Sequence, residues 1–145
     1  MCDGKILGMD QLRTCPTCQV PQPESEFYVA AEARRSARVG RRITYGCRSC
    51  ASARMSRRRS NRLALVLERK AAGCVDCGHV DLAHPEVFDF DHVRGDKTSG
   101  VASLATSGSV EDLIAEMDKC EVVCANCHRI RTKARPATTR GRSRK

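Results

Sequence analysis

Four C-x2-C pairs are the residues of this sequence most suited to chemistry. They are Cys15/Cys18, Cys47/Cys50, Cys74/Cys77 and Cys124/Cys127. Two intervening residues let the chain form a tight knuckle that places both sulfurs on one edge of a tetrahedron, and two knuckles complete a Zn²⁺ site. The first two pairs and the last two pairs are consecutive, so the simplest arrangement is two structural zinc sites, each with four cysteine ligands. A crossed pairing stays open, although it would need interlocked loops.

Two cysteines remain outside these pairs. We expect Cys120 to be a small buried residue on an apolar helical stripe and Cys2 to lie in a frayed terminus. The N-terminal segment has no apolar signal region, and the longest apolar run is only LALVL, residues 63–67. The sequence therefore predicts a cytoplasmic protein, and in a reducing cytosol C-x2-C pairs indicate metal sites rather than disulfides.

The composition allows only a small core. The chain has 145 residues, no Trp, two Tyr and three Phe, and domains of this size usually need metals or disulfides as staples. We expect a small α+β zinc-stabilised protein with four parts. They are an N-terminal zinc ribbon with four cysteine ligands (12–51), a basic linker helix (52–72), a second zinc module (73–134) and a basic disordered tail (135–145).

Charge is segregated along the chain. Residues 33–67 contain eleven Arg and no acid, residues 129–145 contain eight Lys or Arg and no acid, and residues 68–128 contain twelve acids against five Lys or Arg. Basic arms gain affinity for a polyanion by releasing counterions, while carboxylates hold cations. The pattern favours a metal-using site that acts on nucleic acid. The alternative is that the Arg-rich stretches are merely solvated.

The segment that follows the first module predicts a helix. It contains no Pro, and Gly73 is placed to end it. Arg54, Arg58 and Arg62 recur every four residues, so a helix would align them in one stripe able to contact phosphates. A solvated connector is an equal alternative. In the first module, we expect Phe27 and Tyr28 to fill a small core rather than to stack on bases.

The second module combines zinc ligands with an Asp-His pair. Residues 86–93 predict a strand that contains Asp91 and His92. A loop rich in Gly and Ser follows, and then a helix capped by Ser109. The segment EVVCANCHRIRTKAR predicts a short strand, the last knuckle and a basic helix that carries His128.

This order of motifs resembles the HNH, or ββα-metal, endonucleases, especially the zinc-stapled proteins of phages and actinobacteria, in which a sequence close to VVCANCHRIRT is typical. The resemblance covers residues 73–133. The first module resembles the zinc ribbons of proteins related to recombination endonuclease VII, on the basis of Pro23, Ser25 and Phe27. A bacterial or phage-infected host cell is the compartment that this resemblance implies.

The resemblance implies a role for each polar residue. Asp91 and His128 would hold one divalent ion, Mg²⁺ or Mn²⁺, separate from the structural zincs. His92 would be the general base that takes a proton from the attacking water. The products would be a 5′ phosphate and a 3′ hydroxyl. The residues expected to contact phosphates on the last helix are Arg129, Arg131 and Lys133.

Two features depart from this family pattern. Strict alternation along a strand sends Asp91 and His92 to opposite faces. We therefore predict an irregularity at that point: the strand must twist, bulge or end there for both to reach one phosphate. The family's central Asn, which orients the base, normally lies nine positions before the final His, and here that position is Lys119. Asn126 could take this catalytic supporting role, or a backbone carbonyl could orient His92 instead.

Less specific interpretations remain open. His128 could cap the knuckle or replace a Cys on zinc, His92 could be a satisfied strand histidine, and Asp89 could be a surface acid or a neighbour of the site. The leading hypothesis is a metal-dependent endonuclease that acts on DNA, with phage packaging or recombination proteins as further partners. The alternative is a non-catalytic zinc-stabilised module that binds nucleic acid.

Overall fold

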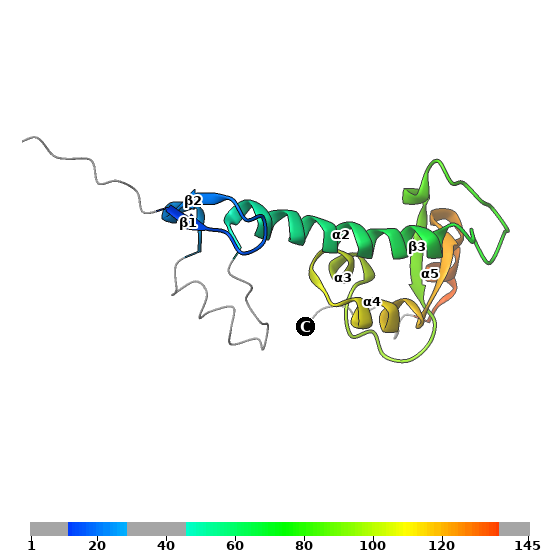
Figure 1. Cartoon of the computed structure of the whole chain (residues 1–145). Coiled ribbons are helices and arrows are strands. Elements are labelled where there is room, and N and C mark those ends of the chain that lie inside the picture. Colours follow the sequence, from blue (N-terminus) through cyan, green and yellow to red (C-terminus); the bar gives the residue numbers. More distant parts are fainter. Residues whose placement is uncertain (1–11, 29–45, 137–145) are drawn as a thin grey trace, which may run out of the picture. The chain divides into compact units, whose positions relative to one another are not determined.

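The computed structural model describes residues 12–28 and 46–136, which belong to two compact units, Met1–Arg57 and Arg58–Lys145 (Figure 1). Three segments lie outside the described residues: 1–11 with Cys2, 29–45 in the Arg-rich connection, and 137–145 in the basic tail. The expectations for Cys2 and for the tail are therefore not tested. The described residues form an α+β structure with four α-helices and two small antiparallel sheets.

Unit 1 contains a two-stranded antiparallel sheet. Strand β1 (Leu12–Thr14) pairs with β2 (Pro21–Pro23), and the first cysteine knuckle forms the turn between them. Gln19 closes this turn with a φ of 60°, and its amide donates to the carbonyl of Cys15 at 2.9 Å. The short 3-10 helix η1 (Glu24–Glu26) follows.

The two aromatic residues after η1 have different environments. Phe27 is buried against Cys15 and Cys47, which confirms that it fills the core of this unit. Tyr28 is 46% exposed, and the guanidinium of Arg48 lies 4.7 Å from its ring centroid. The expectation that Tyr28 fills the core is therefore wrong.

Helix α2 (Arg48–Lys70) is the longest element and confirms the predicted helix. It begins earlier than expected, inside the second cysteine pair, so that Cys50 lies in its first turn. It ends before Gly73, whose φ of +79° favours glycine, and a Cβ there would lie 2.6 Å from the carbonyl oxygen of His79. No described helix, α2 included, is long and apolar enough to cross a membrane.

Unit 2 is built around strands β3 (Phe88–His92) and β4 (Cys120–Cys124) and helix α5 (Ala125–Ala134). The strands pair antiparallel, and α5 follows β4 without a loop. A 3-10 turn, η2 (Pro85–Val87), precedes β3, so the strand is shorter than predicted. The strand with Asp91, the short strand before the last knuckle and the basic helix are present where the sequence predicts them, with two further helices between the strands in the sequence.

The described sheet is regular between Asp91 and His92, and the strand ends at His92, which is one of the three forms of the predicted irregularity. The register is continuous to the last pair, His92 with Cys120. It breaks directly afterwards, because the amides of Val93 and Arg94 both donate to the carbonyl of Lys119, at 3.0 and 3.1 Å. The side chains of Asp91 and His92 thus keep the opposite directions of a regular strand.

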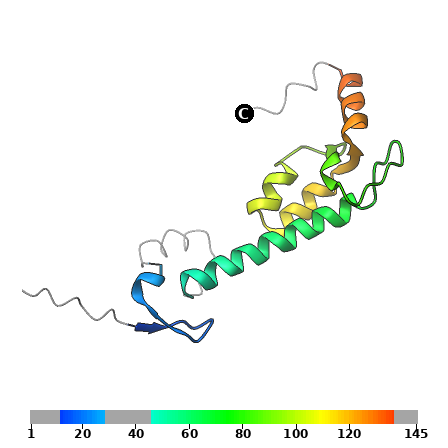
Figure 2. The same ribbon diagram turned by 90° about the horizontal axis from the view of Figure 1, so that it is seen from above.

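Two helices, α3 (Val101–Ser107) and α4 (Val110–Met117), lie between the strands in the sequence and beside α2 in space (Figure 2). Ser109 caps α4 as predicted, accepting a hydrogen bond from the amide of Asp112 at 3.0 Å. Helix α3 was expected to be a loop. The core that these helices share is formed by Val101, Ala105, Leu113, Met117 and Cys120, with Leu65 and Val66 of α2 packed against it.

Cys120 belongs to this core, as expected, but it begins β4 rather than ending the preceding helix. Arg62 corrects another expectation. Its side chain is buried, with an exposed fraction of 7%, and it donates to the carbonyls of Ala105 and Thr106 at the end of α3. Those carbonyls have no partner within the helix, and Arg62 supplies one. Arg62 is therefore not available to contact phosphates.

Candidate functional site

The first cysteine cluster lies in unit 1. The sulfurs of Cys15, Cys18, Cys47 and Cys50 all lie within 4.8 Å of one another, and the sulfurs of Cys15 and Cys50 are 4.0 Å apart. Four sulfurs about 2.3 Å from one zinc lie about 3.8 Å apart at the corners of a tetrahedron. The residues therefore fit a structural zinc ion.

The second cluster lies in unit 2 and joins Cys74, Cys77, Cys124 and Cys127, also within 4.8 Å. Its sulfurs are supplied by the turn after α2, the end of β4 and the first turn of α5. The side chain of Cys124 also caps α5 by accepting from the amide of Cys127. The consecutive pairing predicted from the sequence is confirmed in both clusters, which could hold structural metal ions such as zinc.

Ionisation within the clusters agrees with cation binding. The amides of Cys18 and Cys47 lower the pKa of Cys15 to about 6. Burial opposes ionisation of Cys74, but the amides of Cys124, Cys77 and Asp76 lower its pKa to about 6. Hydrogen bonding to Cys47 raises the pKa of Cys50 to about 12. One thiol in each cluster thus ionises readily, and a divalent cation would favour ionisation of the others.

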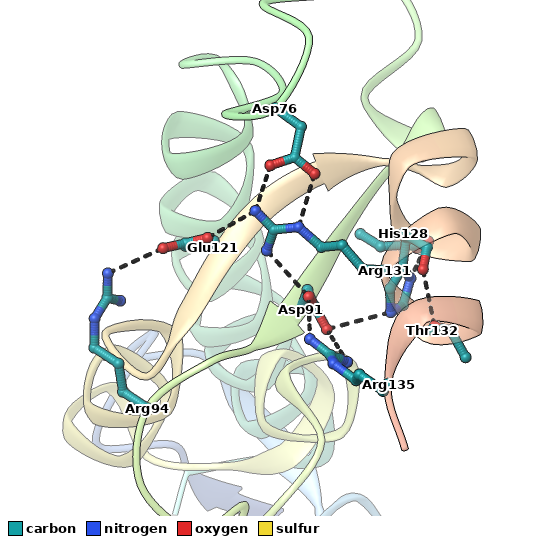
Figure 3. Close-up of polar contacts among 9 residues, drawn as sticks. Asp76, Asp91, Arg94, Glu121, His128, Arg131, Thr132 and Arg135 are labelled. Atoms are coloured by element: carbon teal, nitrogen blue, oxygen red, sulfur yellow. Dashed lines mark hydrogen bonds and ion pairs between the residues drawn. The ribbon is translucent and has the colours of Figure 1, made fainter. Parts of the chain in front are cut away.

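Asp91 is the buried carboxylate of the β3–α5 interface. It is 2% exposed, and Arg135 donates to both its oxygens while Arg131 donates to Oδ2 at 3.1 Å (Figure 3). Burial alone would raise the pKa of Asp91, but these guanidinium groups hold it below its usual range. Asp91 is therefore an anion that two arginines neutralise.

His128 faces Asp91 from helix α5. Its Nε2 lies 3.5 Å from Oδ1 of Asp91, and its Nδ1 lies 2.9 Å from Oδ2 of Asp89. A carboxylate only accepts, so Asp89 favours the tautomer in which Nδ1 carries the proton and the Nε2 lone pair faces Asp91. The structure brings Asp91 and His128 close together and places Asp89 beside His128.

Arg131 links this site to the rest of unit 2. Its guanidinium lies between the carboxylates of Asp76, Asp91 and Glu121, and it bonds all three (Figure 3). Asp76 lies inside the knuckle between Cys74 and Cys77, so the second cluster and the Asp91 site share one polar network. Arg131 was predicted to contact phosphates, but its charge is already compensated within the fold.

The side chain of His92 lies on the opposite face of β3 from that of Asp91, which faces His128. Nε2 of His92 is 2.9 Å from Oε1 of Glu116, a residue of α4. The side chain of Glu116 is only 1% exposed and also accepts bonds from Thr98, Ser99 and Lys119. The partner of His92 is therefore Glu116.

Asn126 does not take that place. It lies exposed in the first turn of α5, and within the described part of the chain its side chain makes no hydrogen bond with His92. Lys119, at the position where the HNH pattern has Asn, donates to Glu116 at 2.8 Å. It reaches His92 through that carboxylate.

Four other basic residues that were predicted to contact phosphates lie in two places. Arg129 and Lys133 line a cavity of about 460 Å³ on α5 with Asp89, His128 and Thr132. Arg58 is exposed on α2, whereas Arg54 is half-buried. These four residues remain predicted contacts for phosphates.

Three comparisons with known proteins give no significant match. No family model, no curated protein and no solved structure matches the chain. The resemblance to HNH endonucleases thus remains a prediction from sequence motifs.

Glu116 and Arg135 are the site residues that sequence reasoning missed. Glu116 lies 24 positions after His92, and only the folding of α4 against the end of β3 brings the two together. Its place between Leu113 and Met117 on the apolar face of α4 was the available signal, because an acid on a buried face needs partners.

Proposed function

We propose that this chain is a metal-dependent endonuclease of the HNH type that hydrolyses phosphodiester bonds in DNA. The observation that carries the proposal is the pair formed by Asp91 and His128. A buried carboxylate oxygen and an imidazole nitrogen lie 3.5 Å apart at the junction of a strand and a helix. Two ligands about 2.1 Å from an octahedral ion lie about 3 Å apart, so a small movement would fit Mg²⁺ or Mn²⁺.

The tautomer of His128 supports the same proposal. With the Nδ1 proton held by Asp89, a lone pair on Nε2 faces a negative oxygen of Asp91. Two electron-rich atoms at this distance repel each other unless a cation neutralises them. The guanidinium groups of Arg131 and Arg135 partly meet that need, and a metal ion would compete with them for Asp91.

The chemistry of the bound ion would be to polarise the scissile phosphate and stabilise the leaving 3′ oxygen. His92, the last residue of β3, would take the proton of the attacking water. Because Asp91 and His92 point to opposite faces, the phosphate would have to lie across the end of the strand. The exposed basic side chains of Arg129 and Lys133 would hold the DNA backbone beside His128.

A second candidate is a zinc-stabilised module that binds nucleic acid without cleaving it. The observation that favours it is that two arginines donate hydrogen bonds to both oxygens of Asp91, so the carboxylate has partners without a metal ion. In that case the polar network of Asp76, Asp91 and Arg131 would serve only to hold α5 on the sheet.

A plasmid nicking assay with added Mg²⁺ or Mn²⁺ separates the two candidates. We expect the zinc-loaded chain to convert supercoiled plasmid to the open circle, and His92→Ala to lower the rate by about 10²- to 10⁴-fold. His84→Ala is the matched control, because His84 is an exposed loop residue bonded only to its neighbours. Equal traces of cleavage by wild type and His92→Ala at matched purity would leave only the binding module.

A further inference from the structure

Glu116 is a buried anion in unit 2. Its side chain is 1% exposed, and five hydrogen bonds converge on its two oxygens. Oε1 accepts from the amides of Thr98 and Ser99 and lies 2.9 Å from Nε2 of His92. Oε2 accepts from the hydroxyl of Thr98 at 2.5 Å and from the ammonium of Lys119 at 2.8 Å.

This environment keeps the carboxylate ionised. Burial alone would raise the pKa of Glu116, but the Lys119 ammonium, the Thr98 hydroxyl and the Ser99 amide hold it well below its usual range. An ionised carboxylate can only accept hydrogen bonds, so Nε2 of His92, which lies at hydrogen-bond distance from Oε1, must carry a proton. In neutral His92, Nε2 is then protonated and Nδ1 carries the free lone pair.

The geometry points to Glu116 as the positioning residue for His92: its carboxylate fixes both the ring orientation and the tautomer that leaves Nδ1 as the proton acceptor. The catalytic part of this inference rests on the proposed endonuclease function, because a fixed lone pair matters when the imidazole takes a proton from water. The hydrogen bond itself does not depend on that function.

The hydrogen bond to His92 serves the imidazole more than the carboxylate. Thr98, Ser99 and Lys119 already supply four donors to Glu116, which satisfies a buried carboxylate. His92, by contrast, has Glu116 as its side-chain partner among the described residues. Loss of this bond would free the ring of His92 while leaving the carboxylate bonded.

Lys119 restrains His92 in two further ways. Its ammonium holds Glu116 and also donates to the carbonyl of Asp96 at 3.1 Å. Its own carbonyl accepts from the amides of Val93 and Arg94, the two residues that follow His92. Lys119 thus fixes both the partner of the imidazole and the backbone beside it.

The first test needs no variant of Glu116. Nitrogen-15 NMR of the histidine rings in the zinc-loaded full chain, at a pH where His92 is neutral, should show a proton on Nε2 that exchanges slowly with water. His92→Gln assigns the signal by its loss. A neutral His92 with its proton on Nδ1, or with a rapidly exchanging Nε2 proton, would overturn the inference.

The second test is the isosteric variant Glu116→Gln in the plasmid nicking assay. We expect it to lower kcat by about 10- to 100-fold with little change in DNA affinity, as loss of a supporting hydrogen bond commonly does. Glu111→Gln is the matched control, because Glu111 is an exposed acid in the first turn of the same helix. Thermal melting identifies any loss of fold.

A double-mutant cycle separates positioning from a general structural role. If Glu116 acts through His92, Glu116→Gln should cause no further loss of cleavage in the His92→Ala background. Equal losses in both backgrounds would show that Glu116 acts elsewhere and would overturn the inference. If wild type fails to cleave, the proposed function fails, and the Nε2 proton signal alone then decides whether Glu116 fixes the ring of His92.

Discussion

The two cysteine clusters use the same four ligands but lie beside different charged residues. Around the cluster of unit 1, the nearby charged residues of α2 are basic, and Arg54 and Arg57 line a cavity of about 340 Å³ beside Cys50. Beside the cluster of unit 2 lie three acids, Asp76 inside the knuckle and Asp89 and Asp91 on the adjoining strand, which pair with basic residues of α5 and its end. The C-x2-C spacing thus predicts a structural metal site in both units. The chemistry of each unit depends on the other residues that its metal site positions.

The two clusters also differ in the elements to which their cysteines belong. In unit 2, Cys124 ends β4 and its side chain caps α5. One cysteine of the cluster thus also positions the helix that carries His128. In unit 1, Cys50 begins a long helix whose next residues carry no acid and no histidine. Within the described part of the chain, the second cluster is therefore the one that adjoins the candidate site of Asp91 and His128.

The largest expected effect comes from removing one ligand of either cluster. Cys18 and Cys77 are matched, since each is the exposed second cysteine of its knuckle. We expect metal analysis to give two zincs in wild type and one in Cys18→Ser and in Cys77→Ser. A structural zinc site contributes about 10–16 kcal/mol in small peptides, so only the unit that loses its zinc should unfold.

Amide NMR spectra locate the damage. In Cys77→Ser, the amide signals of β3, β4 and α5 should be poorly dispersed, and nicking should be lost. In Cys18→Ser, the signals of these three elements should be unchanged. Cys120→Ala is the control for cysteine number and should keep both zincs, because Cys120 lies outside both clusters. Loss of both zincs from Cys18→Ser would contradict the independence of the two sites.

Local patterns in the sequence explain why much of this framework could be predicted. Cysteine spacing, the Ser109 cap and Gly73 after α2 act over a few residues, and the structure has each of them as expected. Helix α3 was missed because its segment is rich in small residues typical of loops. Its stability comes from Arg62, 43 positions away in the chain, and from the burial of Val101 and Ala105.

The polar partners of the site were missed for the same reason. Strand alternation correctly predicts that Asp91 and His92 point apart, but it says nothing of what each side chain meets. The arginines on Asp91 come from the end of α5, and the carboxylate on His92 comes from α4. Contacts between elements distant in sequence are decided by packing, which a single sequence does not encode in a local pattern.

The arginines of α2 differ in role, because Arg62 is buried in the fold and Arg58 lies on the surface. We expect Arg62→Gln to lower the free energy of unfolding of unit 2 by about 2 kcal/mol, because a buried charged donor to the carbonyls of Ala105 and Thr106 is lost. Arg58→Gln, one turn earlier and exposed, should change stability by less than about 0.5 kcal/mol. Urea denaturation of the zinc-loaded chain measures both.

DNA binding should rank the same two variants in the opposite order. Arg58→Gln should reduce the salt dependence of binding, since an exposed arginine near a phosphate contributes about one released counterion. Arg62→Gln should leave that slope unchanged while lowering stability. A stable Arg62→Gln protein with a reduced salt slope would show that Arg62 reaches DNA after all.

The smallest effect is expected from a variant that tests whether Asp91, beside the second cluster, can bind a metal ion. Arg135 occupies both oxygens of Asp91, so a divalent ion must displace it. We expect Arg135→Gln to tighten Mn²⁺ binding in the absence of DNA by about tenfold. That factor corresponds to release of one charge-assisted hydrogen bond of about 1.5 kcal/mol.

Electron paramagnetic resonance of free Mn²⁺, with the zinc sites loaded, measures this affinity directly. Arg129→Gln is the matched control, because Arg129 is an exposed arginine of the same helix region that does not bond Asp91. Asp91→Asn should abolish the tighter binding in the Arg135→Gln background. If Arg135→Gln and Arg129→Gln bind Mn²⁺ equally, the arginine does not compete with the ion. The two clusters would then differ in charge without differing in the metal ions that their surroundings accept.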